Sequence, residues 1–418
     1  MPQAGVKYSE IRAIDPTAPP VVIDIAGNLE NKKAFKLSDI ASSVRYIILQ
    51  QPPDTKFTSI SDMVSDDEHI FINSLEGLFC YSTEGQYLYT VCANQLESID
   101  FWGSGKTSGT CVVSGVFNNI DLLNGRLIYR TRHFPSLEEG DPDLRLNVFD
   151  IKELDAQMRF NSNINELKNF NPQPKYQRRL NPKKDIGLLS QFLLMDDLSL
   201  FFSNSLTSVA IYGDTLCKFN NYAQPVIDAI GARRGVYVGV PSNSYRINGE
   251  IMLLLGHNDT VFRVTPPNRL TPAYVMNWGK FRPDISEHVA GSALDGKFVF
   301  SNLFETSRFI FIHYTEGRDY PARRKEGKVK DHWAIFNKTA KTLTHHLPSD
   351  EFIMFENNLE PVGIPFWLKG VNHKDEMYMT FSKKRIEDYI ATGRYQNDKL
   401  QAIYDRMPDD AICIMIVK

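Results

Sequence analysis

The sequence predicts an all-β fold: a single six-bladed β-propeller of four-stranded antiparallel blades, with short helical insertions. Three observations predict it. The chain has 418 residues, 42% of them hydrophobic, which is enough to bury a large core. Short β-rich runs separated by turn residues recur along its length. Apolar runs near its two ends can pair with each other, and that pairing closes a ring of blades without unpaired sheet edges.

The first expected blade is the clearest. Four β-rich runs occupy residues 60–64, 69–73, 77–81 and 86–91, and turn residues such as Ser-Asp-Asp-Glu at 65–68 separate them. Four strands in so short a segment form a meander with two faces to cover. Such a unit is not stable alone, so we expect it to repeat.

The pattern recurs less regularly in five further groups of runs. Asn124-Gly125 and Asn248-Gly249 have the sequence of two-residue hairpin turns. The groups are spaced more widely than the ~40–45 residues of a WD40 blade, so insertions are expected. The further expected strands are 119–123, 126–130, 146–150, 191–195, 198–202, 208–212, 216–219, 245–247, 250–255, 259–264, 274–278, 297–300, 308–314, 333–336, 366–368 and 376–381.

Two helical segments and a closing pair of strands complete the expected domain, which covers residues 1–418. The helical candidates are 152–170 and an insertion at 382–407, where Ser382 can cap the helix. Within a closing segment at residues 20–50, the run 44–49 is expected to pair with the run 411–417, because the terminal blades otherwise leave unpaired edges.

Several segments, in this order and spacing, resemble one known family. The first is the run from Phe35 to Leu49, and six more follow it. These are 78–88 (LFCYSTEGQYL), 258–264 (NDTVFRV), 270–274 (LTPAY), 277–280 (NWGK), 304–309 (FETSRF) and 406–411 (RMPDDA). Together they are similar to the six-bladed β-propeller proteins abundant in the cell envelopes of Bacteroidetes. One departure is the loop at 100–107 (DFWGSGKT), where that family usually has a Gly- and Pro-rich turn.

The resemblance implies a location and no reaction. It implies a lipoprotein of the cell envelope, in the periplasm or on the outer surface, whose signal and lipid-bearing cysteine lie upstream of Met1. The membrane would then be reached only through that lipid anchor. The family carries no catalytic residues over to this chain.

Nucleic-acid, metal and cofactor chemistry find no support in the sequence. Lysine and arginine (47) nearly balance aspartate and glutamate (50), whereas nucleic-acid binding domains are usually basic. Gly103-Ser104-Gly105-Lys106-Thr107 resembles the end of a phosphate-binding loop, but the first glycine of that motif would fall at Asp100. The five cysteines form no C-x-x-C pair, and no H-E-x-x-H motif occurs. We expect no cofactor, no metal and no nucleic-acid partner.

Eight residues are candidates for a ligand site. They lie beside expected strand ends and combine ring faces, on which sugars stack, with charged hydrogen-bonding groups. Because each blade contributes only one or two side chains at the centre of a propeller, we expect these residues to line a central cavity. The candidates are Trp102, Arg132, His133, Tyr245, Arg246, Glu305, Arg308 and Trp367.

Alternatives remain for parts of this site. Glu305 and Arg308 are expected to form a salt bridge within one blade. Trp102, Trp333 and Trp367 are candidates for sugar stacking, with a place in the core as the alternative. The basic stretch at 318–330 either attracts an anionic ligand or is a solvated hairpin, since acidic residues interleave with its six cations.

The residues favour a noncatalytic binding or scaffold protein, with glycans as one candidate class of ligand. Stacking aromatics and polar loops are present, whereas no acid–base pair or nucleophile motif can be named. The alternative is a glycan hydrolase or lyase acting at the same cavity, because carboxylate pairs come together only in space. Its partner would be a glycan or other small ligand, or an envelope protein.

Overall fold

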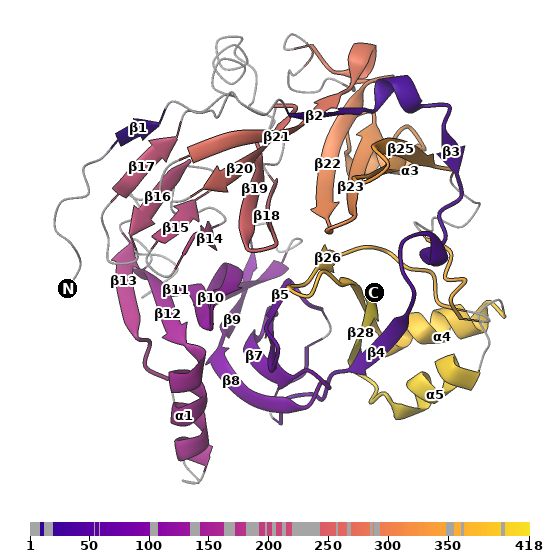
Figure 1. The fold of residues 1–418 in the computed structure, drawn as a ribbon. Coiled ribbons are helices and arrows are strands. Elements are labelled where there is room, and N and C mark those ends of the chain that lie inside the picture. Colours follow the sequence, from indigo (N-terminus) through magenta and orange to yellow (C-terminus); the bar gives the residue numbers. More distant parts are fainter. Residues whose placement is uncertain are drawn as a thin grey trace. The chain divides into compact units, whose positions relative to one another are not determined.

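The computed structural model describes most of the chain, and Figure 1 shows its fold. The described residues are 9–11, 20–53, 55–57, 59–100, 108–133, 143–162, 172–180, 192–196, 199–202, 206–210, 215–219, 243–255, 258–265, 269–284, 287, 293–347, 355–360, 363–393 and 398–418.

These residues form a propeller-like all-β fold made of six small sheets of four or five strands each. The chain divides into two compact units. The first comprises Met1–Ser43, Leu216–Met377 and Lys418, and the second comprises Val44–Thr215 and Tyr378–Val417.

Two five-stranded sheets dominate the first unit. In each, four strands form an antiparallel meander and a strand from the N-terminal segment pairs parallel with the last of them. One sheet contains β18 (Asn243–Ile247), β19 (Glu250–Leu254), β20 (Thr260–Thr265), β21 (Arg269–Asn277) and β2 (Val21–Asp24). The other contains β22 (Phe298–Glu305), β23 (Phe309–Glu316), β24 (Lys330–Asn337), β25 (Thr342–His346) and β3 (Lys32–Lys33). This unit also holds β26 (Gly370–Val371) and a parallel pair of β1 (Ser9–Ile11) with β17 (Thr215–Phe219).

The second unit contains the remaining strands. The first meander has β5 (Asp62–Ser65), β6 (His69–Asn73), β7 (Gly77–Ser82) and β8 (Tyr87–Ala93). The next sheet has β9 (Gln95–Asp100), β10 (Ser108–Leu123), β11 (Arg126–His133), β12 (Asp143–Asp150) and β13 (Tyr176–Leu180). Then follow β14 (Phe192–Leu194), β15 (Ser199–Phe202) and β16 (Thr207–Ala210), and finally β27 (Met377–Ser382), β28 (Ile412–Val417) and β4 (Val44–Ile48).

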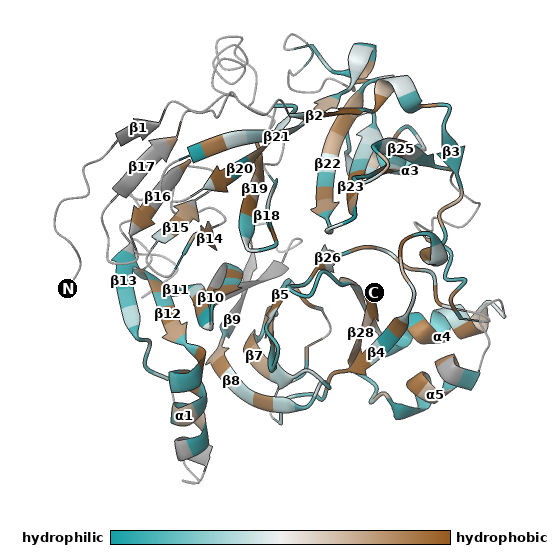
Figure 2. Ribbon diagram, in the orientation of Figure 1, coloured by the Kyte–Doolittle hydropathy of each residue, from teal (hydrophilic) through white to brown (hydrophobic). Residues whose placement is uncertain are grey.

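The expected pairing of the two chain ends is confirmed. Strands β4 and β28 pair antiparallel, with Ile48 opposite Cys413 and Val44 opposite Val417. Every side chain of β28 is buried, and Figure 2 shows the strand as a continuous hydrophobic run. Burying one such aliphatic side chain is worth about 1.5–3 kcal/mol, so this pairing is a large source of stability.

The two glycine turns are also confirmed. Asn124 and Gly125 both adopt positive φ angles (51° and 72°), as do Asn248 and Gly249 (49° and 79°). A type I′ hairpin turn requires this conformation at both central residues, and Asn-Gly is the sequence that adopts it most easily. The turns set the registers of β10 with β11 and of β18 with β19.

Few helices interrupt the strands. Helix α1 (Ile151–Ser162) occupies the start of the expected helix at 152–170, whose remainder lies outside the described residues. Helices α4 (Lys383–Ala391) and α5 (Asp398–Arg406) lie in the insertion expected at 382–407, and the Ser382 hydroxyl accepts a hydrogen bond from the Arg385 N–H, as predicted for a cap. The other helical turns are α3 (Pro321–Lys325), η1 (Ala26–Asn28), η2 (Leu37–Asp39) and η5 (Gly279–Phe281). Within the described part of the chain, no helix has the length and apolar character to span a membrane.

One expected strand is wrong. The run at 366–368 forms only an isolated bridge, between Phe366 and Phe355. Phe366 and Leu368 are nevertheless buried. Their apolar pattern therefore indicates a loop that is buried against the core, and not a strand.

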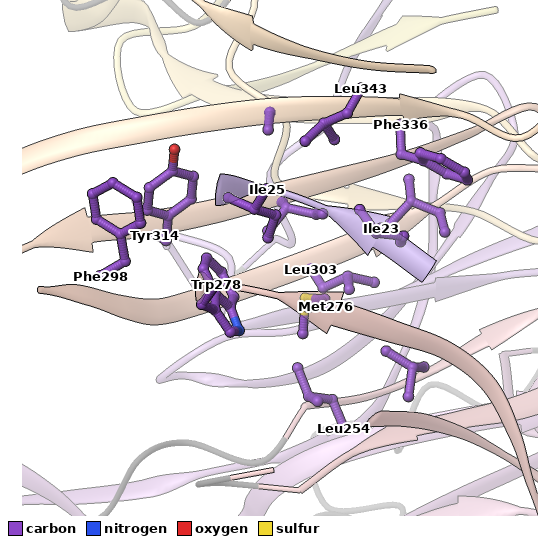
Figure 3. Packing of buried hydrophobic residues seen from close by; sticks show 14 of the residues in the cluster. Ile23, Ile25, Leu254, Met276, Trp278, Phe298, Leu303, Tyr314, Phe336 and Leu343 are labelled. Atoms are coloured by element: carbon purple, nitrogen blue, oxygen red, sulfur yellow. The ribbon is translucent and has the colours of Figure 1, made fainter. Parts of the chain in front are cut away.

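The core of the first unit lies between its two large sheets (Figure 3). Trp278 packs edge-on against Tyr314, with ring centroids 5.4 Å apart. Ile23 and Ile25 come from the N-terminal segment and are fully buried in this cluster. The segment therefore adds side chains to the core as well as a strand to the sheet.

In the second unit, a charged cluster joins α1 to the first meander. His69 on β6 contacts Asp66 through Nδ1 and Asp155 of α1 through Nε2, both at 3.2 Å. The Tyr89 hydroxyl donates to the other Asp155 oxygen at 2.5 Å. The hydrogen bond to Asp155, and then that to Asp66, raises the pKa of His69 to about 10. Burial alone would raise the pKa of Asp155, but hydrogen bonds from His69 and Tyr89 outweigh it and lower that pKa.

Replacing Asp155 by Asn should therefore destabilise the protein in a pH-dependent way. A raised folded-state pKa means that the contribution of His69 is complete below its ordinary value of 6.5 and is lost as the pH rises through about 10. We expect the difference in unfolding free energy between wild type and Asp155→Asn to be largest near about pH 6 and to shrink steadily by about pH 9. Urea unfolding at fixed ionic strength measures it.

Glu153→Gln is the matched control on the same helix. Glu153 is more than half exposed and pairs only with Lys175 among the described residues. Its effect should stay small and constant over the same pH range. A constant difference for Asp155→Asn as well would contradict a protonated His69.

Candidate functional site

Five of the eight candidate residues lie in the first unit. These are Tyr245, Arg246, Glu305, Arg308 and Trp367. Arg132 and His133 lie at the end of β11 in the second unit, and Trp102 lies outside the described residues. The expectation that all eight line one cavity stays a prediction, whereas two clusters within the first unit can be described directly.

The first cluster surrounds Glu305, at the end of β22. Its carboxylate accepts hydrogen bonds from the Tyr245 hydroxyl (2.7 Å), the Tyr274 hydroxyl (2.8 Å) and Lys338 Nζ (2.8 Å). Tyr245 lies on β18 and Tyr274 on β21, so the cluster joins the two large sheets of this unit. Two of the eight candidates, Tyr245 and Glu305, therefore contact each other.

The protonation states and hydrogen bonds of this cluster indicate that it stabilises the fold. Burial, together with the Glu305 carboxylate, raises the pKa of both Tyr245 and Tyr274, so the phenols stay protonated and donate. The Glu305 side chain is only 1% exposed and already has three donors. A ligand would have to displace those donors to reach it, so we assign Glu305 to the support of the fold.

The expected salt bridge between Glu305 and Arg308 is wrong. Glu305 pairs with Lys338, which follows β24, and Lys338 also donates to the Thr306 carbonyl at 3.0 Å. The Arg308 guanidinium lies instead over the ring of Phe309, with Cζ 4.9 Å from the ring centroid. Arg308 is exposed, so it gains more from staying solvated than from entering the buried cluster.

The second cluster consists of three rings, Trp367, Trp333 and His313, which we call the aromatic shelf. Trp333 on β24 and His313 on β23 are direct partners in the sheet, and their rings stack 4.5 Å apart at 15°. Trp367 meets Trp333 edge-on, with centroids 5.8 Å apart at 88°. Trp333 is 5% exposed but Trp367 is 45% exposed, the highest value for any Trp, Phe or Tyr that the structure describes.

An ion network borders the shelf. His313 Nε2 lies 3.0 Å from Asp331 Oδ1. Arg324 of α3 contacts Asp331 through Nη1 (2.6 Å) and Nη2 (3.1 Å), and it contacts Asp319 through Nε (2.5 Å) and Nη2 (2.7 Å). The hydrogen bond from His313 and those from Arg324 hold the pKa of Asp331 far below its usual value. Asp331 is therefore charged, and it fixes the orientation of the imidazole.

One donor in the shelf has no partner among the described residues. Trp333 Nε1 is buried without a hydrogen-bond acceptor. A buried unsatisfied donor costs about 1–3 kcal/mol, which a ligand acceptor would recover.

Sequence reasoning identified part of the shelf. Trp367 and Trp333 were candidates for sugar stacking, with a place in the core as the alternative. Trp333 takes that alternative, because it is buried, whereas Trp367 is exposed. His313 and Asp331 were missed, although Asp331 and Trp333 are two residues apart on one strand and must share a face. That spacing was the available signal, and the pairing of β23 with β24 was needed to add His313. No group of three His, Cys, Asp or Glu side chains in the described ranges is arranged to hold a metal ion.

Comparisons place the chain in a family without a known function. A model of a domain of unknown function, DUF4933, matches residues 3–392, so the chain belongs to the DUF4933 family. No curated protein matches it. Its structure is similar to that of a candidate exported protein from Bacteroides fragilis, with 11% identity and a TM-score of 0.58 over 96% of this chain and all of the other. A protein of unknown function from Bacteroides caccae matches with 10% identity and a TM-score of 0.30, over 73% of this chain and 98% of the other.

Replacing Lys338 by Met tests the role of the Glu305 cluster. The substitution leaves a buried carboxylate with neutral donors only, and we expect a loss of about 2 kcal/mol in unfolding free energy, below the 3–5 kcal/mol of a fully buried pair because Lys338 reaches solvent. Urea unfolding followed by tryptophan fluorescence measures this loss.

Arg308→Ala is the control for that measurement. Because Arg308 is exposed and does not contact Glu305, we expect a change within about 0.5 kcal/mol. A loss for Arg308→Ala as large as the loss for Lys338→Met would contradict the assignment of Lys338 as the charge partner of Glu305.

Proposed function

We propose that this member of a family of unknown function is a noncatalytic binding protein of the cell envelope and that it binds carbohydrate at the aromatic shelf. One observation carries the proposal: Trp367 keeps 45% of its surface exposed while it is held edge-on by a buried Trp333. A lone exposed apolar side chain needs no explanation. A fixed indole beside an oriented imidazole is the arrangement that a sugar ring requires, with a flat apolar face and adjacent polar groups.

The preorganisation of the shelf supports binding. Trp333 is fixed by stacking on His313, and His313 is fixed by Asp331. A ligand would therefore order few side chains on arrival, and it would lose little of the binding free energy to that ordering. The proposed ligand therefore lies within one unit of the chain, and the shared central cavity expected from the sequence stays a prediction.

A second candidate function is a glycan hydrolase or lyase. The observation that favours it is the pair of His313 Nε2 and Asp331, because an imidazole oriented by a carboxylate can act as a general base. A turnover assay on each glycan that binds separates the two functions, since product formation would overturn the noncatalytic proposal. A scaffold that binds an envelope protein remains the outcome if no glycan binds.

We also propose that the small sheets are the blades of a β-propeller. The β4 and β28 pairing supports it, because a strand from each end of the chain completes the last sheet. Crystallography of the full chain tests the number of blades.

Trp367→Ala should abolish most carbohydrate binding. Removing a stacking tryptophan from the centre of a site typically costs more than about 2 kcal/mol, so we expect affinity to fall at least about thirtyfold. A glycan array finds the ligand, and isothermal titration calorimetry with the strongest glycan measures the loss.

Leu88→Ala provides the matched control, because Leu88 is also 45% exposed but lies on β8 of the second unit. Its affinity should equal that of wild type. If Trp367→Ala and Leu88→Ala bind equally well, the aromatic shelf is not the site.

The envelope location makes a separate prediction. The similarity in fold to a candidate exported protein supports export of this chain. We expect the native gene to encode a signal sequence and a cysteine upstream of Met1, and the protein to partition with the membrane fraction until its lipid is removed. Recovery of the native protein in the cytoplasmic fraction would contradict this location.

A further inference from the structure

We infer that the ligand of the aromatic shelf is an uncharged saccharide that accepts a hydrogen bond from the Trp333 indole. The inference rests on the proposed function, because it specifies the ligand of the same site. It follows from two independent features of the described residues, the saturation of nearby cations and the unpaired indole donor.

Arg324, the cation that binds Asp331 beside the shelf, is already occupied. A guanidinium recognises an anionic sugar through paired N–H groups, as it does any carboxylate or phosphate. All three nitrogens of Arg324 are engaged by Asp319 and Asp331. They have no free edge for a uronate, a sialic acid or a sulfate.

The other cations of the basic stretch at 318–330 are largely matched as well. Arg323 pairs with Asp295, Lys328 with Glu326, and Lys330 with Glu316. Beside the shelf, two carboxylates face one guanidinium, so an anionic ligand would meet repulsion there. The pairing of these cations therefore favours the solvated hairpin over attraction of an anionic ligand.

Trp333 Nε1 is the one buried polar ring atom of the shelf that the structure identifies as unpaired, and it is a donor. Trp333 Nε1 can donate and cannot accept, so the ligand has to supply an acceptor. A sugar hydroxyl, a ring oxygen or an acetamido carbonyl is such a group. Trp367 packs edge-on against Trp333, so a ligand that stacks on Trp367 lies beside the ring that carries this N–H.

Two variants test the inference on a glycan array that carries neutral glycans beside uronate, sialylated and sulfated ones. Trp333→Phe retains an aromatic ring and removes only the N–H donor and part of the ring. We expect it to weaken binding about tenfold, which corresponds to one lost hydrogen bond in a desolvated site. Asp319→Asn frees one edge of Arg324, and we expect it to admit anionic glycans while leaving the affinity for neutral glycans unchanged.

The results separate the two proposals. Binding that depends on Trp367 and is confined to neutral glycans supports both. Anionic glycans that bind in a Trp367-dependent manner as tightly as neutral ones overturn this inference and leave the proposed function standing. If Trp333→Phe binds with full affinity and its thermal stability shows that it is folded, the proposed hydrogen bond from the Trp333 indole to the ligand is wrong. If no glycan binds through Trp367, both proposals fail.

Discussion

The pairing of outer strands is the constraint on which this fold depends. A short sheet leaves the backbone N–H and C=O groups of its last strand without partners, and those groups must be satisfied. The N-terminal segment provides partners in turn: β1 pairs with β17, β2 with β21, β3 with β25 and β4 with β28. The first three pairings are parallel, because the segment passes from one sheet to the next and does not return through a hairpin. The position of the aromatic shelf depends on this device, since β3 completes the sheet that carries Trp333 and His313.

Much of the fold was predictable because its signals are local. The period of two along each strand and the Asn-Gly turns give the meanders directly, and a continuous apolar run gives the buried strand β28. The added strands were harder to predict. β3 consists of Lys32 and Lys33, whose side chains carry no signal for a strand, and it pairs through its backbone alone. The run at 366–368 shows the opposite error, because its apolar residues indicate burial and not backbone pairing.

The site was predictable by residue type but not by contact. Tyr245 and Glu305 are 60 residues apart, and only the packing of two sheets brings the phenol to the carboxylate. Lys338 follows a different strand again, which is why the nearer Arg308 was the expected partner. Trp333 and Trp367 were candidates for stacking, but Trp333 is buried and is held in place by its contact with His313, which Asp331 orients. Neither of those residues is unusual alone, and they act together because the β23 and β24 register sets them beside Trp333.

The two clusters of the first unit differ in how well their polar groups are hydrogen-bonded. This difference is why we assign the Glu305 cluster to the support of the fold and the aromatic shelf to ligand binding. Glu305 is almost inaccessible, and every donor around it is engaged, so any ligand would have to compete with bonds already made. The Trp333 N–H is equally buried and has no acceptor. Other buried atoms in the described ranges lack partners too, so an unpaired donor alone does not make a site. What distinguishes Trp333 is its contact with Trp367, a half-exposed ring on which a ligand can stack. A saccharide that stacks on Trp367 and accepts from Trp333 would gain apolar contact and a hydrogen bond that the free protein lacks, whereas no comparable gain is available at Glu305.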